Sequence, residues 1–326
     1  MRRTAFTRLL LAYLTCALFG TAAVHAQDKP PKPLLIDAHM HVWTDDPVRF
    51  PFAHPYNAKF VPPKIPASLR ILVKEMDDHG VRHCVLVQTI SHGWDNSYLV
   101  HCLQAEPKRF KGQGLIDPTD PQVAEKLDYW MKKPGMAGMR FSPMYYQGKD
   151  AWLNARASDA LWEKAAELGA VFNFFIASSQ LPKLEDMVRR HPKVKVVVDH
   201  VGRIDLIPEK SPAPGYDPLV EVNKLLALAR YPNVWVKVSE LSSLSASKKY
   251  PFRDTYPIVK KVYDAFGPDR LLWGTGFPGA TRAEAERPTL EQELAIIQKE
   301  IPFFTAQDRL KILGKNAAKV WGIDAR

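Results

Sequence analysis

Residues 35–41 read Leu35-Ile-Asp-Ala-His39-Met-His41, an apolar run that ends in two histidines one residue apart. Because side chains alternate between the two faces of a strand, both histidines are expected to project from the same face. This run is the first of eight short segments, most of them β-branched or aromatic throughout, as is typical of strands buried on both faces. The predicted strands cover 34–41, 84–90, 112–116, 136–141, 171–176, 194–200, 234–239 and 271–275.

Between these runs lie segments in which apolar residues recur at helical spacing. In the first of them, Ser68 is the expected N-cap and Gly80 the expected end of the helix. The predicted helices cover 68–80, 98–106, 121–133, 155–169, 181–191, 219–231, 256–267, 290–299 and 305–321. A strand followed by a helix, repeated eight times, predicts an α/β fold, a single-domain (β/α)8 TIM barrel. The rival open, doubly wound sheet normally has a glycine-rich phosphate loop after its first strand, and no such loop is present here.

The first 26 residues have the pattern of a signal peptide, with a basic start at Arg2, Arg3 and Arg8, an apolar run and a small-residue cleavage site before Gln27. An uncleaved membrane anchor is the alternative, but the apolar run is interrupted and shorter than the roughly 20 residues of a span. Residues 27–33 form a Pro-rich linker, and 34–326 form the barrel domain. We therefore expect a secreted or periplasmic protein without stable membrane insertion.

The formal net charge of the full chain is +10, with acidic residues mixed among the basic ones. This dispersed pattern favours a solvated surface over nucleic-acid binding and leaves a weak attraction for an anionic small-molecule substrate. No interface pattern distinguishes a monomer from a homodimer. Cys84 and Cys102 have no metal-type spacing and are expected to be buried thiols, with a disulfide as the alternative.

Active sites of such barrels form at the carboxyl ends of the strands. His39 and His41 end the first predicted strand, and His200 ends the sixth. Imidazoles placed there can bind one divalent metal, zinc or a similar ion, or can polarise a carbonyl directly. His200 is a candidate third ligand, general base or electrophile. Strand alternation places Asp199 on the opposite face, where it would hold a loop or helix. The alternative to a functional site is that the histidines only cap their strands through hydrogen bonds.

Arg140 ends the fourth predicted strand, where a guanidinium suits a substrate carboxylate or a lactone carbonyl, although a structural ion pair is an equal alternative. Aromatic and imidazole side chains in the loops after strands one, two and four are candidates for a substrate wall. The residues selected for substrate binding are Arg140, Trp43, His92 and Tyr145.

Five motifs together resemble the amidohydrolase-related (amidohydrolase 2) family, and most closely its sugar-acid lactonases and 2-pyrone-4,6-dicarboxylate lactonases. They are Ile36-Asp-Ala-His39-Met-His41, Gly138-Met-Arg140, Val198-Asp-His200-Val-Gly202, Val236-Lys-Val-Ser239 and Leu272-Trp-Gly-Thr-Gly276-Phe-Pro278. The resemblance implies a distorted TIM barrel that hydrolyses a C–O or C–N bond. It also implies that metal use varies: many members bind zinc or a similar ion, some lactonases work without a metal, and some relatives decarboxylate.

The sequence departs from the family pattern at two strands. The fifth strand lacks the histidine of metal-dependent relatives, and Gly276 stands where the family usually has a strand-eight aspartate that activates water. Glycine has no proton acceptor in its side chain, so residue 276 cannot be the general base. Glu240 after strand seven and His200 are the selected catalytic candidates, with Asp117 after strand three as a further possibility.

These features predict a hydrolase that opens a small lactone, or a similar ester or amide, by attack of water. Two alternatives remain: a catalytically impaired family member that binds a ligand outside the cytoplasm, which Gly276 favours, and a decarboxylase of the same superfamily.

Overall fold

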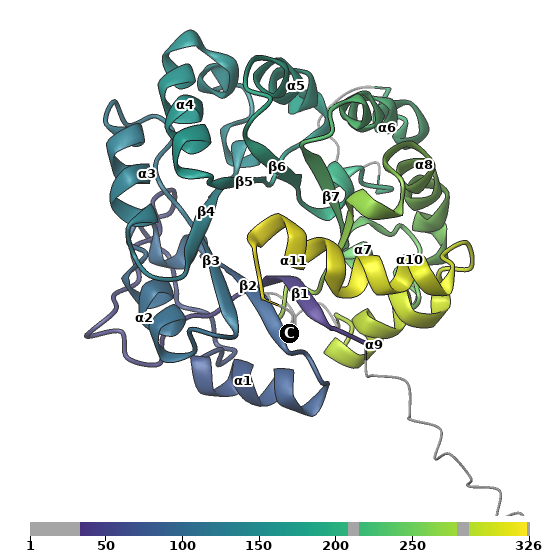
Figure 1. Ribbon diagram of the computed structural model, residues 1–326, viewed down its shortest axis with the longest axis horizontal. Helices are drawn as coiled ribbons and strands as arrows, with labels where there is room; N and C mark the ends of the chain where they lie inside the picture. Colours follow the sequence, from purple (N-terminus) through teal and green to yellow (C-terminus); the bar gives the residue numbers. More distant parts are fainter. Residues whose placement is uncertain (1–32, 208–214, 279–286, 325–326) are drawn as a thin grey trace, which may run out of the picture. The chain divides into compact units, whose positions relative to one another are not determined.

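The computed structural model describes residues 33–207, 215–278 and 287–324. Eight strands form one sheet in which sequence neighbours pair in parallel, and helices surround it (Figure 1). The strands are β1 Ile36–Met40, β2 His83–Val87, β3 Phe110–Gly114, β4 Met136–Phe141, β5 Val171–Phe174, β6 Lys195–Val198, β7 Val234–Ser239 and β8 Leu271–Gly274. Each overlaps a predicted strand.

The sheet closes between β1 and the residues that follow β8. Met40 forms a parallel bridge with Phe277, and the His41 amide donates to the Phe277 carbonyl at 2.7 Å. The Gly276 amide donates to the His39 carbonyl, also at 2.7 Å. A closed sheet of eight parallel strands confirms the predicted single-domain (β/α)8 barrel.

The main helices follow the predicted segments. They are α1 Leu69–Asp78, α2 Ser97–Ala105, α3 Val123–Met131, α4 Asp159–Leu168, α5 Leu181–Arg190, α6 Pro218–Leu226, α8 Tyr256–Phe266 and α9 Leu290–Ala295. A short helix that was not predicted, α7 Leu241–Leu244, follows β7 directly, and the segment expected as one helix over 305–321 is α10 Ala306–Leu310 and α11 Asn316–Trp321. A π-helical turn at Lys311–Lys315 separates them.

The apolar interior has two parts. The larger fills the space between strands and helices, as expected for strands buried on both faces. The smaller lies inside the barrel and combines strand residues such as Val85 and Val197 with Val320 and Trp321 of α11. Helix α11 crosses the opening that faces the viewer in Figure 1, and the ammonium of Lys195, at the start of β6, donates to the Val320 carbonyl. The helix therefore covers the end where strands begin, and the site must lie at the other end.

Cys84 and Cys102 are free and buried, which confirms the expected thiols. Among the described residues, no helix is long and apolar enough to cross a membrane. The predicted signal peptide, residues 1–26, and nearly all of the linker lie outside the described residues.

Candidate active site

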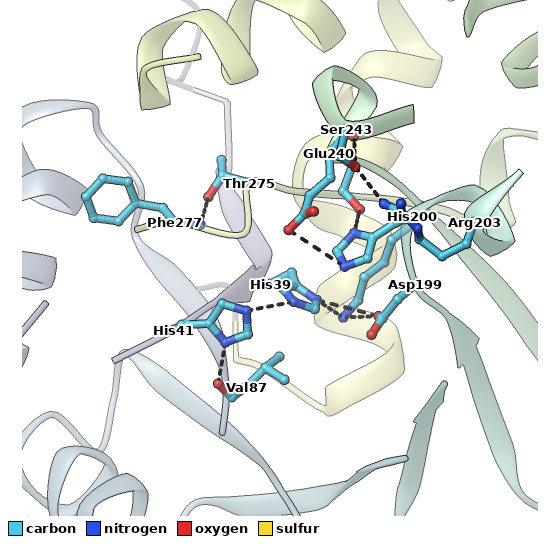
Figure 2. A network of polar contacts seen from close by, with 12 residues as sticks. His39, His41, Val87, Asp199, His200, Arg203, Glu240, Ser243, Thr275 and Phe277 are labelled. Atoms are coloured by element: carbon cyan, nitrogen blue, oxygen red, sulfur yellow. Dashed lines mark hydrogen bonds and ion pairs between the residues drawn. The ribbon is translucent and has the colours of Figure 1, made fainter. Parts of the chain in front are cut away.

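Three histidines meet at the carboxyl end of the barrel (Figure 2). The Nε2 atoms of His39 and His41 are 3.1 Å apart, which agrees with the prediction that both rings leave β1 on one face. The ring of His200, which follows β6, has its centre 4.7 Å from that of His39. Side chains from strands far apart in the sequence are thus assembled within one small volume.

A fixed neighbour holds the Nδ1 atom of each ring. His41 Nδ1 donates to the Val87 carbonyl at 2.7 Å, and His200 Nδ1 lies 2.9 Å from the Ser239 hydroxyl. His39 Nδ1 lies 3.0 Å from the ammonium of Lys237. Burial lowers the pKa of His41 and of His200 to about 4, so both rings are neutral at pH 7. With each Nδ1 held, the Nε2 atoms of His39 and His41 face one another, and Nε2 of His200 faces Glu240.

Beneath the rings lies a buried charge network centred on Asp199. Its carboxylate is 2.9 Å from the ammonium of Lys237 and 2.9 Å from Nε of Arg140. Burial alone would raise the pKa of Asp199, but Lys237, His39 and Arg140 outweigh it and hold this pKa well below its usual range. The expectation that Asp199 points away from the barrel is therefore wrong. Strand β6 ends at Val198, so the alternation of a strand no longer governs the residues after it.

The turn after β6 has an uncommon backbone. His200, Val201 and Arg203 have φ values of 49°, 53° and 50°, and Gly202 between them has 65°. The left-handed region costs an L-residue roughly 1–2 kcal/mol, and a β-branched residue such as Val201 is rarely found there. Strained turns of this kind cluster at functional sites, and here the turn directs the His200 ring into the barrel mouth.

Glu240 follows β7 and also adopts the left-handed conformation, with a φ of 53°. Its Oε1 atom lies 3.8 Å from His200 Nε2 and 3.4 Å from a guanidinium nitrogen of Arg287. Burial would raise the pKa of Glu240, but His200 and Arg287 lower it strongly, so the carboxylate is ionised. The side chain lies directly against Gly276.

These groups open onto a cavity of about 340 Å³. Its lining includes His41, His200 and Glu240. It also includes three of the four predicted substrate-binding residues, Trp43, Arg140 and Tyr145, together with Phe175 and Arg287. The Arg140 guanidinium lies 4.7 Å from the centre of the Phe175 ring, a cation–π distance that fixes its plane.

The structure does not bring His92 or Asp117 to this cavity. His92 Nδ1 is held by the Pro51 carbonyl at 3.2 Å, its Nε2 accepts from the Thr44 amide at 3.4 Å, and its ring stacks on Phe52. His92 therefore fastens the loop after β1 instead of lining the wall. Asp117 accepts from the amide and hydroxyl of Thr119 in its own loop.

Lys237 and Arg287 belong to the site but were not selected from the sequence. Lys237 is a fully buried lysine in the middle of the apolar run of β7, and that contrast was a usable signal, because an unpaired lysine is almost never fully buried. Arg287 lies in the segment before α9, where no periodicity or motif marks it.

The donor set fits a divalent metal. Two nitrogens bound tetrahedrally to one zinc at about 2.0–2.1 Å would lie about 3.3 Å apart, close to the 3.1 Å between His39 and His41 Nε2. Metal-binding histidines usually donate the other ring N–H to a carbonyl, carboxylate or similar acceptor, as His41 does to the Val87 carbonyl and as His200 can to the Ser239 hydroxyl. His39, Asp199 and His200 also offer ligand atoms that all lie within 4.8 Å of one another.

A closed parallel barrel with histidines gathered at its carboxyl end (Figure 2) has the arrangement of a TIM-barrel enzyme. The chain belongs to the amidohydrolase family, because the family model of that description matches residues 36–323. This match confirms the resemblance inferred from the motifs.

The chain is 27% identical to a 4-sulfomuconolactone hydrolase of Hydrogenophaga intermedia, over 88% of each protein. It is 29% identical to a 2-pyrone-4,6-dicarboxylate hydrolase of Comamonas testosteroni, over 74% of this chain and 76% of the relative. A zinc-bound amidohydrolase structure from Burkholderia multivorans covers 89% of this chain and 100% of its own, with a TM-score of 0.67 and 20% identity. The structural likeness shows the shared fold.

Proposed function

We propose that the protein opens a small anionic lactone by adding water to the ring carbonyl. The observation that carries this proposal is the pairing of His200 Nε2 with Glu240 Oε1, 3.8 Å apart, on a cavity that also presents Arg140. The gap is wider than a hydrogen bond, so a water molecule beside it can contact both groups. The names of the curated relatives, which are lactone hydrolases, support the same substrate class.

Each group has a distinct task in this reaction. Glu240 is ionised and takes a proton from the attacking water, while neutral His200 accepts its second hydrogen bond and orients it. The new C–O bond forms at the lactone carbonyl, the ring C–O bond breaks, and the proton on Glu240 passes to the departing ring oxygen. The product is a hydroxy acid.

Arg140 stabilises the negative charge that develops on the carbonyl oxygen. Its Nε is committed to Asp199, and among the described residues its other N–H groups have no hydrogen-bond partner. Arg287 lines the same cavity and suits an anionic substituent of the substrate. His39 and His41, whose Nε2 atoms lie 3.1 Å apart, would hold a divalent metal, which would supply Lewis-acid activation of the carbonyl or of water, while His200 Nε2 stays with the water.

The test is ring opening by the purified mature protein on sugar-acid lactones and on anionic lactones derived from aromatic acids, with and without a chelator. Glu240→Gln and His200→Gln should each lower kcat by about 100- to 10,000-fold. His83→Gln is the matched control, because His83 lies at the start of β2, away from the cavity, and should leave kcat unchanged. A folded protein that binds these lactones without turnover would support the binding-protein alternative, and carbon dioxide release would identify a decarboxylase.

We also propose that the protein acts outside the cytoplasm, on the support of the basic start, apolar run and small-residue site of residues 1–26. N-terminal sequencing of protein recovered from the periplasm or medium should begin at Gln27. Recovery with Met1 intact would contradict export with cleavage.

A further inference from the structure

We propose that Glu240 and Gly276 are a matched pair, in which the missing side chain at 276 creates the space that the carboxylate of residue 240 occupies. The inference rests on the proposed function for its catalytic part only. A Cβ atom built on Gly276 would lie 3.2 Å from Cδ and 3.3 Å from Cγ of Glu240, and closer still to Oε1. Any side chain at 276 would therefore displace the carboxylate.

Neither backbone can move aside to relieve that collision. The Gly276 amide donates to the His39 carbonyl at 2.7 Å, where the barrel closes. The neighbouring Thr275 is fixed in turn, since its hydroxyl donates to Asp37 at 2.7 Å. On the other side, the Glu240 carbonyl accepts from the Ser243 amide at 2.9 Å in the first turn of α7. The space between positions 240 and 276 is thus defined by two rigid strand ends.

The atom of Glu240 that a side chain at 276 would displace also belongs to the candidate active site. The Glu240 Oε1 atom that would meet a side chain at 276 is the same atom that faces His200 Nε2 and Arg287. Strands β7 and β8 are neighbours, with Ser239 paired to Gly274, so one acidic position beside His200 can be reached from either strand. Glu240 is then the catalytic residue, and Gly276 is a positioning residue that acts through it.

This geometry predicts that the carboxylate can be moved from one strand to the other. Gly276 has a φ of 67°, a conformation that aspartate and asparagine tolerate better than most residues. Aspartate at 276 should therefore fit once the Glu240 side chain is removed, and asparagine there provides a control of the same shape without the charge.

The first test needs no substrate. Gly276→Ala is introduced into the natural chain and into Glu240→Ala, and the urea midpoint of unfolding is measured for all four proteins. The backbone cost of alanine at a positive φ is common to both backgrounds, so it cancels in the comparison. We expect the midpoint to fall at least twice as far in the natural chain as in Glu240→Ala. Equal falls in the two backgrounds would overturn the pairing.

The second test uses a lactone that the natural protein opens. Glu240→Ala should lower kcat by about 100- to 10,000-fold. The double variant Glu240→Ala with Gly276→Asp should have a kcat at least tenfold above that of Glu240→Ala, with a KM within a few-fold of the KM of Glu240→Ala. Glu240→Ala with Gly276→Asn should show no such gain, and Gly276→Asp alone should fall below the natural protein because two carboxylates then compete for one space.

The possible failures are distinguishable. Recovery by asparagine as large as that by aspartate would overturn the exchange of carboxylates, and so would full activity of Gly276→Asp alone. A natural protein that opens no lactone would refute the proposed function, while the unfolding midpoints would still decide whether residues 240 and 276 exclude one another.

Discussion

The ammonium of Lys237 lies 3.0 Å from Nδ1 of His39, inside the barrel and out of contact with solvent. Burial and the charge of Lys237 both lower the pKa of His39 well below its usual value, so the ring carries one hydrogen only. When Lys237 donates to Nδ1 of His39, the single ring hydrogen of His39 is on Nε2, and Nε2 donates to His41. When Nδ1 carries it and faces Asp199 at 3.5 Å, Nε2 is free to bind a metal. Lys237 therefore opposes metal binding through the tautomer of His39.

Replacing Lys237 by methionine should raise the affinity for zinc. The variant removes the donor that places the hydrogen on His39 Nε2, and it also removes a nearby positive charge, so we expect a gain on the order of tenfold. Competition against a chelator of known affinity measures the change. Lys195→Met is the control, because Lys195 donates to a carbonyl at the opposite end of the barrel. An affinity that is unchanged or lower in Lys237→Met would contradict this role.

His41→Asn should lower the bound metal. The substitution removes one of the two Nε2 atoms that lie 3.1 Å apart, and a lost ligand leaves an incomplete site. Metal content after purification in zinc should drop from about one equivalent per chain to a small fraction of it, and the stabilisation of the natural protein by added zinc should disappear. His54→Asn, in the loop after β1, should behave like the natural protein. A natural protein that neither retains zinc nor is stabilised by it would refute the metal assignment.

Asp308 should stabilise the C-terminal helices in a pH-dependent way. Burial would raise its pKa, but hydrogen bonds from the Thr305 hydroxyl and amide and from the Tyr263 hydroxyl lower it below the usual value. A lowered folded-state pKa means that this contribution is complete above the unfolded pKa of about 3.9 and is lost as the pH falls through the folded value.

Asp308→Ala should accordingly reduce the free energy of unfolding at pH 7 by about 1–2 kcal/mol. Urea unfolding between pH 3 and pH 7 should show this deficit shrinking at the acidic end. Asp264→Ala removes an exposed ion pair with Lys260 and should change stability by no more than about 0.5 kcal/mol. A deficit that stays constant down to pH 3 would show that the carboxylate charge is not responsible.

The strands were predictable because a parallel barrel buries both faces of each one, and this requirement leaves continuous apolar runs in the sequence. The histidines of β1 were predictable for a related reason, since strand alternation fixes the relative direction of His39 and His41. The same rule failed at Asp199, which lies one residue beyond the last strand residue of β6. The direction of a side chain at the end of a strand depends on the turn that follows. The left-handed turn at His200 could not be predicted, because valine, its second residue, is disfavoured at a positive φ.

Other parts of the site depend on contacts between distant segments. That Glu240 lies against Gly276, and that Arg287 approaches the same carboxylate, follows from how β7, β8 and the residues before α9 are arranged in space. Because Gly276 has no carboxylate, the sequence provided a reason to look for one elsewhere. It did not show that residues 240 and 276 are in contact.

The left-handed turn at residues 200–203 also bears on how the protein can evolve. A residue that tolerates a positive φ better than Val201 would lower the strain of the turn. It would also hold the neighbouring imidazole of His200 less firmly in its orientation. Selection for a durable protein and selection for rapid turnover therefore act in opposite directions at this turn. Homologues adapted to heat are expected to gain their resistance elsewhere in the barrel and to keep this turn as it is.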